Sequence, residues 1–243
     1  EILPISSSGH LVLGKTLLQV ESPGVLLEAV LHGGSLLAIL VYYRARLAAL
    51  MNGVWRGAGG ARRDAAAILV GCLPAAVCGL LFGSAVESAF ASPRVTAAGL
   101  IATGLLLLVP RIVKPASRPG RVTVGQAAAV GLAQVAALLP GVSRSGTTIT
   151  VGRLAGAEGR EAASFSFLMA IPLLAGALGL SLVKAAGQAP SISPAALGLG
   201  FAVAAGVGYV AMALLNRLLA SNRLWWFGPY CLAVGSAALL VVR

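Results

Sequence analysis

The sequence predicts an all-α integral membrane protein, and three observations point to this class. Hydrophobic residues make up 58% of the chain and charged residues only 10%, against about 45–50% and about 25% in soluble domains. The apolar residues form runs long enough to cross a bilayer, which takes about 20 helical residues. Two serine-rich breaks interrupt these runs, one in each half of the chain. We therefore expect an inverted-topology repeat with six transmembrane helices and two re-entrant helix hairpins.

The first break opens the chain and reads Leu3-Pro4-Ile5-Ser6-Ser7-Ser8-Gly9-His10. A short apolar run over residues 11–20 follows it, and ten residues are too few to span a membrane. We interpret this run as the second arm of a re-entrant hairpin, whose first arm would precede Glu1.

Three spans are predicted between the first break and the second, at residues 25–43, 65–83 and 95–109. Residues 44–64 contain five arginines and a Gly-rich middle, and they are predicted to be a loop. An odd number of spans inverts the second half relative to the first. The chain is thus expected to form one membrane domain (1–243), with a first repeat over 1–110 and a second over 122–243.

The second break reads Leu139-Pro140-Gly141-Val142-Ser143-Arg144-Ser145-Gly146-Thr147-Thr148. Pro140 and Gly141 should end an apolar run over 122–139, and a second arm is predicted over 147–155. The first N–H groups of a new helix carry partial positive charge and bind anions. An arginine at membrane depth costs several kcal/mol unless it is paired, so Arg144 marks a predicted functional site.

Three further spans are predicted at residues 162–183, 195–215 and 224–242. Of the 18 Lys and Arg residues, 13 fall on one side of the membrane, in loops at 44–64, 111–121, 153–160 and 217–223. The positive-inside rule makes this side cytoplasmic. We interpret the net charge of +11 as a topology signal. No nucleic-acid partner is expected, because basic and aromatic residues do not interleave as a base-stacking surface requires.

The polar residues at the two breaks suit phosphoryl transfer, in which positioning and charge neutralisation supply most of the rate. Arg144 can grip diphosphate oxygens, and His10 can exchange a proton near neutral pH. Glu1 is a candidate ligand for a divalent cation, Mg²⁺ or Ca²⁺, bound together with substrate phosphate. The predicted site residues are Glu1, Ser6, Ser7, His10, Ser143, Arg144, Ser145, Gly146 and Thr148.

Two other polar residues in apolar segments are not assigned to the site. His32 precedes Gly33-Gly34 on an apolar segment, and we expect it to have a structural role. Gln134 lies one to two turns before the second break, where it could contact its own backbone or the site.

The two break motifs resemble the signature motifs of the bacterial undecaprenyl-diphosphate phosphatase family, also called bacitracin-resistance proteins. The resemblance covers nearly the whole chain. Supporting matches lie at Leu31-His32-Gly33-Gly34-Ser35-Leu36-Leu37-Ala38 and at Phe165-Ser166-Phe167-Leu168-Met169-Ala170-Ile171-Pro172.

The resemblance implies an inner-membrane enzyme that removes the terminal phosphate of undecaprenyl diphosphate and recycles the lipid carrier for peptidoglycan synthesis, giving bacitracin resistance. It implies that Ser7 and His10 are the nucleophile or proton-transfer residues, without deciding between them, and that Arg144, Ser143 and Thr148 grip the diphosphate. The family's first motif begins with two glutamates, of which Glu1 would be the second. The resemblance also favours a site that opens to the periplasm.

A second function class remains open from the sequence. Broken helices in an inverted repeat are also typical of transporters, and Arg144 would suit a carried phosphate or a flipped lipid head group. A carrier, however, needs no histidine beside a serine cluster, whereas a phosphatase needs a proton donor. A homodimer is compatible with the sequence, which does not set the oligomeric state.

Overall fold

The structure, a computed structural model, describes residues 1–19, 25–113, 120–185 and 192–241, and all regular elements in these ranges are helical. Residues 114–119 of the predicted second basic loop, residue 20 of the predicted first arm and residue 242 of the predicted last span lie outside the described ranges. The helices are α1 (Ser7–Leu18), α2 (Val25–Tyr42), α3 (Arg44–Trp55), α4 (Gly59–Leu81), α5 (Gly83–Phe90), α6 (Pro93–Ile112), α7 (Val124–Ala136), α8 (Arg144–Leu154), α9 (Gly159–Ala185), α10 (Pro194–Ala220), the short 3₁₀ helix η1 (Leu224–Trp226) and α11 (Phe227–Val241).

Within the described residues, five helical segments are long and apolar enough to cross a membrane: α4, α6, α9, α10 and Leu224–Val241. The bent pair α2–α3, whose axes differ by 73°, gives a sixth if it is taken as one span. The protein is thus a multi-pass membrane protein. The prediction of a loop over 44–64 is wrong, because α3 and the start of α4 occupy it. Ala, Leu, Arg and Met dominate residues 44–51, and their high helix propensity outweighs the loop signal of the charges.

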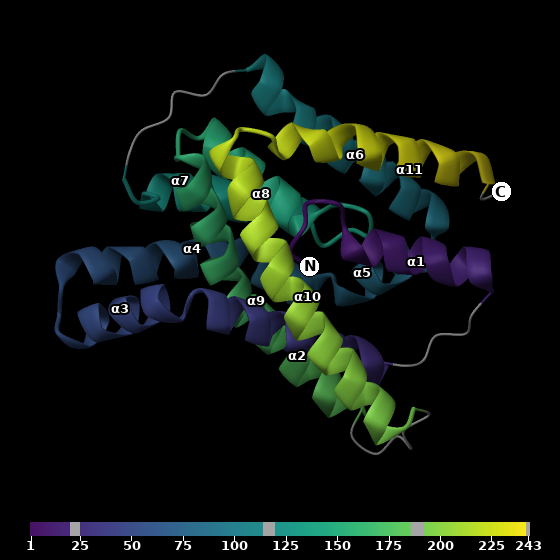
Figure 1. The fold of residues 1–243 in the computed structure, drawn as a ribbon, viewed down its shortest axis with the longest axis horizontal. Coiled ribbons are helices and arrows are strands. Elements are labelled where there is room, and N and C mark those ends of the chain that lie inside the picture. The colour runs from purple at the N-terminus through teal and green to yellow at the C-terminus, as the bar shows by residue number, and fades with distance from the viewer. Residues whose placement is uncertain (20–24, 114–119, 186–191, 242–243) are drawn as a thin grey trace.

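The helices pack against one another in pairs (Figure 1). α6 and α11 lie side by side, α10 crosses α2, α2 packs on α9, and α4 packs on α7. Glycines allow the closest approach: a Cβ on Gly104 of α6 would lie 2.8 Å from the carbonyl oxygen of Gly228 of α11. Small residues at such crossings are typical of helix packing in membranes, where backbones approach closely.

α7 and α8 form an antiparallel hairpin around the second break, close to the arms predicted at 122–139 and 147–155. A capping box between Thr123 and Gln126 starts α7. The side-chain amide of Gln126 also donates to the carbonyl oxygen of Ala155 at 3.0 Å. One turn further on, a Cβ on Gly152 would lie 3.6 Å from Val130. These two contacts fix the register of the hairpin.

The basic segments predicted to share one side lie together at one end of the molecule. Arg46 of α3 makes a bidentate ion pair with Glu161 at the start of α9, with both N–O distances at 2.7 Å. Arg121 pairs with Asp64 of α4, and Arg153 of α8 donates to Asn222 after α10. The grouping of these four segments on one side is therefore consistent with the helix packing.

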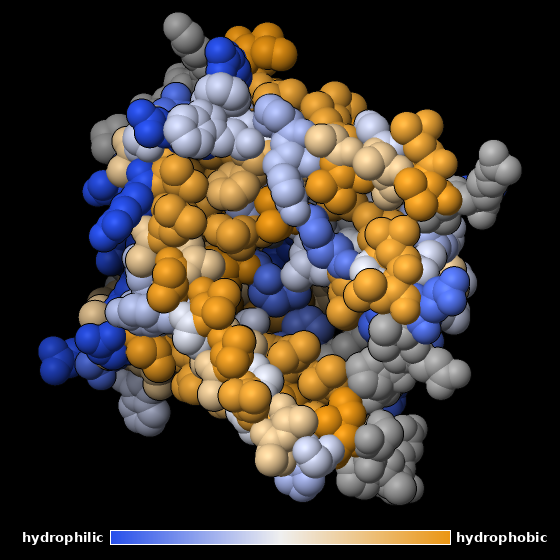
Figure 2. Space-filling view, turned by 45° about the vertical axis from the view of Figure 1, so that its right-hand side comes forward, coloured by the Kyte–Doolittle hydropathy of each residue, from blue (hydrophilic) through white to orange (hydrophobic). Residues whose placement is uncertain are grey.

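The surface suits a lipid environment. Large apolar side chains such as Leu80, Leu199 and Val210 are exposed on the spanning helices. Figure 2 shows a mostly apolar face that surrounds a hollow with hydrophilic residues at its floor. In hydrocarbon, polar groups are tolerated where they line such a cavity.

Candidate functional site

The two serine-rich breaks are in contact. A Cβ on Gly9 would lie 2.9 Å from the Cα of Gly141, so the backbones of the two breaks touch. The Ser145 hydroxyl donates to the carbonyl oxygen of Leu3 at 3.3 Å, and a Cβ on Gly146 would lie 3.3 Å from Pro4. The residues that the sequence placed at two distant breaks thus belong to one region.

The first break ends in a capped helix start. Ser6 has a left-handed backbone conformation with φ of 60°, and its hydroxyl oxygen accepts from the backbone N–H of Gly9 at 3.2 Å, which caps α1. The Ser6 side chain is buried and also lies 3.2 Å from the Ser8 hydroxyl. Ser6 is therefore held by its own helix start, while the hydroxyl of Ser7, at the first position of α1, donates to Glu1.

The second break is held by a threonine from α6. Gly141 has φ of +84°, and a Cβ there would lie 2.0 Å from the carbonyl oxygen of Thr96, so only glycine fits. The Thr103 hydroxyl donates to the Gly141 carbonyl at 2.9 Å and accepts from the Ser143 N–H at 2.9 Å. Ser143 then caps α8 by accepting from the Gly146 N–H at 3.1 Å.

A charged cluster lies where the two breaks meet, and Glu1 is at its centre. The Ser7 hydroxyl donates to Glu1 Oε1 at 2.6 Å. His32 Nε2 of α2 lies 3.4 Å from the same oxygen, and Arg144 Nη2 lies 3.8 Å from Glu1 Oε2. The structure therefore brings together three of the four predicted catalytic residues, Glu1, Ser7 and Arg144.

Arg144 keeps donors available for an anion. Its side chain is 16% exposed, and Nη1 donates to the carbonyl oxygen of Ser166 of α9 at 3.5 Å. Nη2 is buried and makes no hydrogen bond within the described residues. Its charged neighbour is Glu1 Oε2 at 3.8 Å, which is beyond hydrogen-bond distance. The planar fork of a guanidinium matches phosphate oxygens, so an anion is a suitable further partner.

The hydroxyls of Ser143, Ser145 and Thr148 at the start of α8 are already hydrogen bonded within the protein. Ser143 and Ser145 lie with their hydroxyl oxygens 3.3 Å apart. The Thr148 hydroxyl lies 2.6 Å from the Ser166 hydroxyl and donates to the carbonyl oxygen of Arg144 at 2.8 Å. Thr148 is thus tied to α9 one turn behind Arg144, and the Gly146 N–H is taken by the Ser143 cap.

His10 lies outside the Glu1 cluster in its hydrogen bonding. Its Nδ1 is 2.8 Å from the Ser6 carbonyl oxygen, and its Nε2 is 2.8 Å from the hydroxyl of Tyr230 on α11. The two rings are nearly parallel, with centroids 5.6 Å apart. Because a carbonyl only accepts, Nδ1 carries the proton, and in the neutral ring Nε2 accepts from Tyr230. His10, the fourth predicted catalytic residue, is therefore held by α11, the last helix described.

A divalent cation would find one carboxylate here. Within the described ranges, no group of three or more His, Cys, Asp and Glu side chains could hold a metal ion. Mg²⁺ is often held by one or two carboxylates together with substrate phosphates and water. Glu1 fits this sparse arrangement, in which the ion binds together with substrate, and does not fit an all-protein cage.

Several residues of the site region were not assigned from the sequence. His32 was expected to be structural, yet it lies beside Glu1. Three other residues position site residues through the hydrogen bonds given above: Ser166, Thr103 and Tyr230. Each is an ordinary polar residue on an apolar helix. Gln134 is 2% exposed, and neither end of its amide finds a partner within the described residues. A polar residue inside a span was the only available signal for these positions.

Comparison with known proteins identifies the family of this chain. A family model described as bacitracin resistance protein BacA matches residues 1–237. A protein of Geobacter metallireducens named undecaprenyl-diphosphatase is 39% identical over 100% of this chain and 93% of its own length. Two proteins of the same name are also similar. The one from Desulfatibacillum aliphaticivorans is 37% identical over 99% of this chain and 93% of its own length. The one from Rubrobacter xylanophilus is 38% identical over 100% of this chain and 94% of its own length. The chain belongs to the bacitracin resistance protein BacA family.

Proposed function

We propose that this protein hydrolyses undecaprenyl diphosphate to undecaprenyl phosphate and inorganic phosphate, and so recycles the lipid carrier for peptidoglycan synthesis. The names of the full-length relatives support this assignment. The observation that carries it in the structure is the cluster of Glu1, Ser7 and Arg144 at the contact between the two breaks. A nucleophile, a base and an anion-binding group in one place are the parts that phosphoryl transfer requires.

Arg144 is proposed to bind the diphosphate. Its planar fork can hold two phosphate oxygens at once, and its buried Nη2 has no hydrogen-bond partner within the described residues. Arg144 is the first residue of α8, and the N-terminus of this helix adds partial positive charge. Ser143, Ser145, Gly146 and Thr148 are proposed to shape this end of the site. Their hydroxyls and N–H groups hold the helix start in place.

Ser7 is proposed to attack the terminal phosphorus. The Ser7 oxygen forms the new O–P bond, its proton passes to Glu1, and the bond to the bridging oxygen breaks, so that undecaprenyl phosphate leaves. The oxygen of a water molecule then forms a bond to the phosphorus of the phosphoserine and the bond from phosphorus to the Ser7 oxygen breaks. The proton held by Glu1 returns to the Ser7 oxygen, and inorganic phosphate leaves. The 2.6 Å hydrogen bond from Ser7 to Glu1 supports this direction of proton transfer. His10 is the alternative nucleophile, but both of its ring nitrogens are engaged by Ser6 and Tyr230.

Glu1 is also the proposed ligand for a divalent cation, Mg²⁺ or Ca²⁺. When bound, such an ion neutralises phosphate charge. Glu1 can contribute one carboxylate oxygen to it. Three protein groups contact the same carboxylate: Ser7 and His32 lie beside Oε1, and Arg144 lies beside Oε2.

The finer architecture is part of this proposal. We infer an inverted repeat in which the segments after the breaks, α1 and α8, correspond, and each begins with a serine N-cap, Ser6 or Ser143. The pairs α2–α9 and α6–α11, which would be equivalent helices of the two repeats, pack against each other. We further infer two re-entrant hairpins, an inner-membrane location and a site that opens to the periplasm. The distribution of Lys and Arg supports the orientation.

The direct test is release of inorganic phosphate from undecaprenyl diphosphate by the purified protein in detergent, with and without a chelator. We expect hydrolysis by the wild type and its loss in Arg144→Ala and His10→Ala at an unchanged yield of folded protein. Arg160→Ala, at an exposed arginine outside the site, is the control and should keep wild-type turnover. A wild type that releases no phosphate but moves the lipid across a vesicle membrane would overturn the proposal in favour of a transporter.

A further inference from the structure

A basic cavity lies at the opposite end of α8 from Arg144. It has a volume of about 200 Å³ and is lined by Pro110, Arg111, Arg153, Asn222 and Trp225. These residues come from the C-terminal ends of α6 and α8 and from the connection between α10 and α11. A cavity of this size has room for several water molecules or one small polar group.

The lining carries two positive charges and no carboxylate. Arg153 donates to Asn222 Oδ1 at 2.5 Å, a neutral acceptor. Arg111 makes no hydrogen bond or ion pair within the described residues, and its guanidinium lies 3.9 Å from the centre of the Trp225 ring. Within the described residues, no carboxylate compensates the charge of either arginine.

The neighbouring cavity at this end differs, because the arginines beside it are paired with carboxylates. Arg46 is paired with Glu161 and Arg121 with Asp64. Both pairs lie beside the neighbouring cavity between α3, α4 and α9. Arg111 and Arg153 have no carboxylate partner in the part of the chain that the structure describes, and a cavity lies between them.

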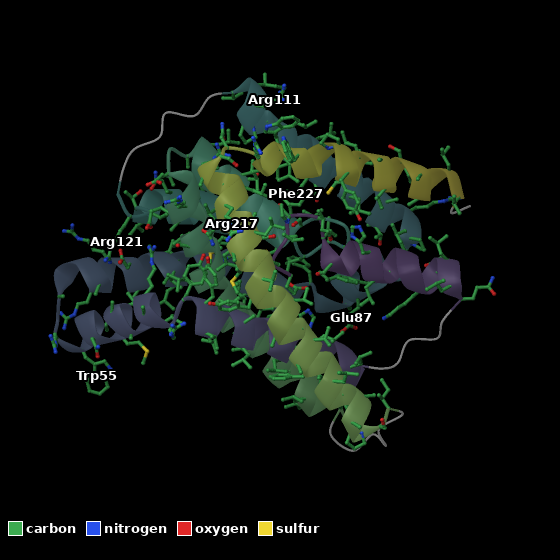
Figure 3. All side chains as sticks on the ribbon, viewed as in Figure 1. Trp55, Glu87, Arg111, Arg121, Arg217 and Phe227 are labelled. Carbon is green, nitrogen blue, oxygen red and sulfur yellow. The ribbon has the colours of Figure 1, made fainter. Side chains whose placement is uncertain are left out.

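The geometry also holds the two side chains ready. The Arg111 guanidinium carbon lies over the Trp225 ring, 3.9 Å from its centre, and this cation–π contact restrains the side chain. Asn222, whose backbone is in the left-handed region with φ of 56°, fixes Arg153 through its side-chain oxygen. Figure 3 shows Arg111 near the end of α6, close to the start of α11, where Phe227 is labelled. Tryptophans and arginines in this combination are typical of the level of lipid head groups.

We propose that this cavity binds a phosphate group, carried by an anionic lipid of the adjacent leaflet or present as free inorganic phosphate. Arginine forks match phosphate oxygens, and basic pockets between transmembrane helices on the cytoplasmic side bind anionic head groups. The positive-inside rule places this end in the cytoplasmic leaflet, which carries the negative surface potential. Arg153 follows Arg144 by nine helical residues, about 14 Å along the helix axis. The cavity is therefore separate from the proposed site of hydrolysis.

Tryptophan fluorescence offers a direct binding test, because Trp225 lines the cavity. Trp55 is 87% exposed on α3 and is replaced by Phe to reduce background. The probes are dihexanoyl phosphatidylglycerol, dihexanoyl phosphatidylcholine and inorganic phosphate, each titrated in detergent at constant ionic strength. We expect saturable binding of a phosphate-bearing anion that weakens about tenfold or more in Arg111→Gln and in Arg153→Gln. It should stay unchanged in the exposed control Arg56→Gln.

The arms of the titration separate the two sources of phosphate. Saturation by phosphatidylglycerol at concentrations where inorganic phosphate and phosphatidylcholine give no response identifies a lipid site. Equal saturation by inorganic phosphate identifies a site for the free ion. A wild-type protein that responds to neither anion, or arginine variants that bind like the wild type while retaining helical content and elution volume, would overturn the proposal.

Discussion

Gly9 and Gly141, which lie in different halves of the chain, are in backbone contact: a Cβ on Gly9 would lie 2.9 Å from the Cα of Gly141. This contact exists because both positions lack a side chain and because Gly141 adopts a positive φ. It sets the distance between the helix starts of α1 and α8. The charged cluster of Glu1, Ser7 and Arg144 follows from that distance.

Replacing Gly141 with Ala should destabilise the protein. The new Cβ would lie 2.0 Å from the Thr96 carbonyl oxygen, and strain with overpacking typically costs about 1–3 kcal/mol. Thermal unfolding in detergent should show a lower midpoint for Gly141→Ala. The control is Gly125→Ala on α7, where a Cβ meets nothing within 4 Å, and alanine there should leave the midpoint unchanged or raise it. An unaltered midpoint for Gly141→Ala would contradict the close contact.

Thr103→Val should weaken the attachment of the second break to α6. The change leaves the buried Gly141 carbonyl and the Ser143 N–H without their partner, and each such loss costs about 1–3 kcal/mol. Thr147→Val is the matched control, because the buried Thr147 hydroxyl has no partner within the described part of the chain. We expect a lower unfolding midpoint for Thr103→Val than for Thr147→Val. The reverse order would show that Thr103 does not hold the break.

Much of the fold could be predicted from the sequence, because hydrophobic length and charge placement are local signals. Five of the six predicted spans and the two breaks follow from apolar runs interrupted by Pro, Gly and Ser. α3 could not be separated from a loop, because helix propensity and charge give opposite signals over residues 44–55. The bend of 73° between α2 and α3 depends on packing against other helices, which the sequence of this segment alone does not predict.

The site was predicted in part for the same reason. Motif residues such as Ser7 and Arg144 are marked by their neighbours in sequence, and the structure places both beside Glu1. His32 and Tyr230 reach the site region from α2 and α11, and such long-range contacts leave no local pattern. The same limit applies to the pairing of His10 with Tyr230, which separates His10 from the Glu1 cluster.

Ser7→Ala should lower phosphate release by at least about 100-fold, the scale of a lost nucleophile or proton-transfer group. Ser8→Ala removes a neighbouring hydroxyl that contacts only the Ser6 hydroxyl within the described residues, and it should stay within a few-fold of the wild type. The measurement is turnover of undecaprenyl diphosphate at saturating substrate. Equal losses in both variants would show that the serine cluster acts through the helix cap and not through Ser7.

Tyr230→Phe tests whether α11 positions His10. The change removes the hydroxyl that is 2.8 Å from Nε2 and keeps the stacked ring. One hydrogen bond of about 0.5–1.5 kcal/mol corresponds to a fall in kcat of about 2- to 12-fold, with KM nearly unchanged. Tyr209→Phe, at a similarly exposed tyrosine on α10, should keep both constants. A rise in KM at constant kcat would assign Tyr230 to substrate binding instead.

The central claim, that the two breaks form one site, is tested most directly by a double-mutant cycle of phosphate release with Glu1→Gln and Arg144→Gln. Residues that act as a unit give strongly non-additive losses. We predict that each single variant loses at least about 100-fold in kcat/KM, and that the double variant is no worse than the poorer single one by more than a few-fold. Losses that multiply in the double variant would show that Glu1 and Arg144 act independently, and would contradict the account.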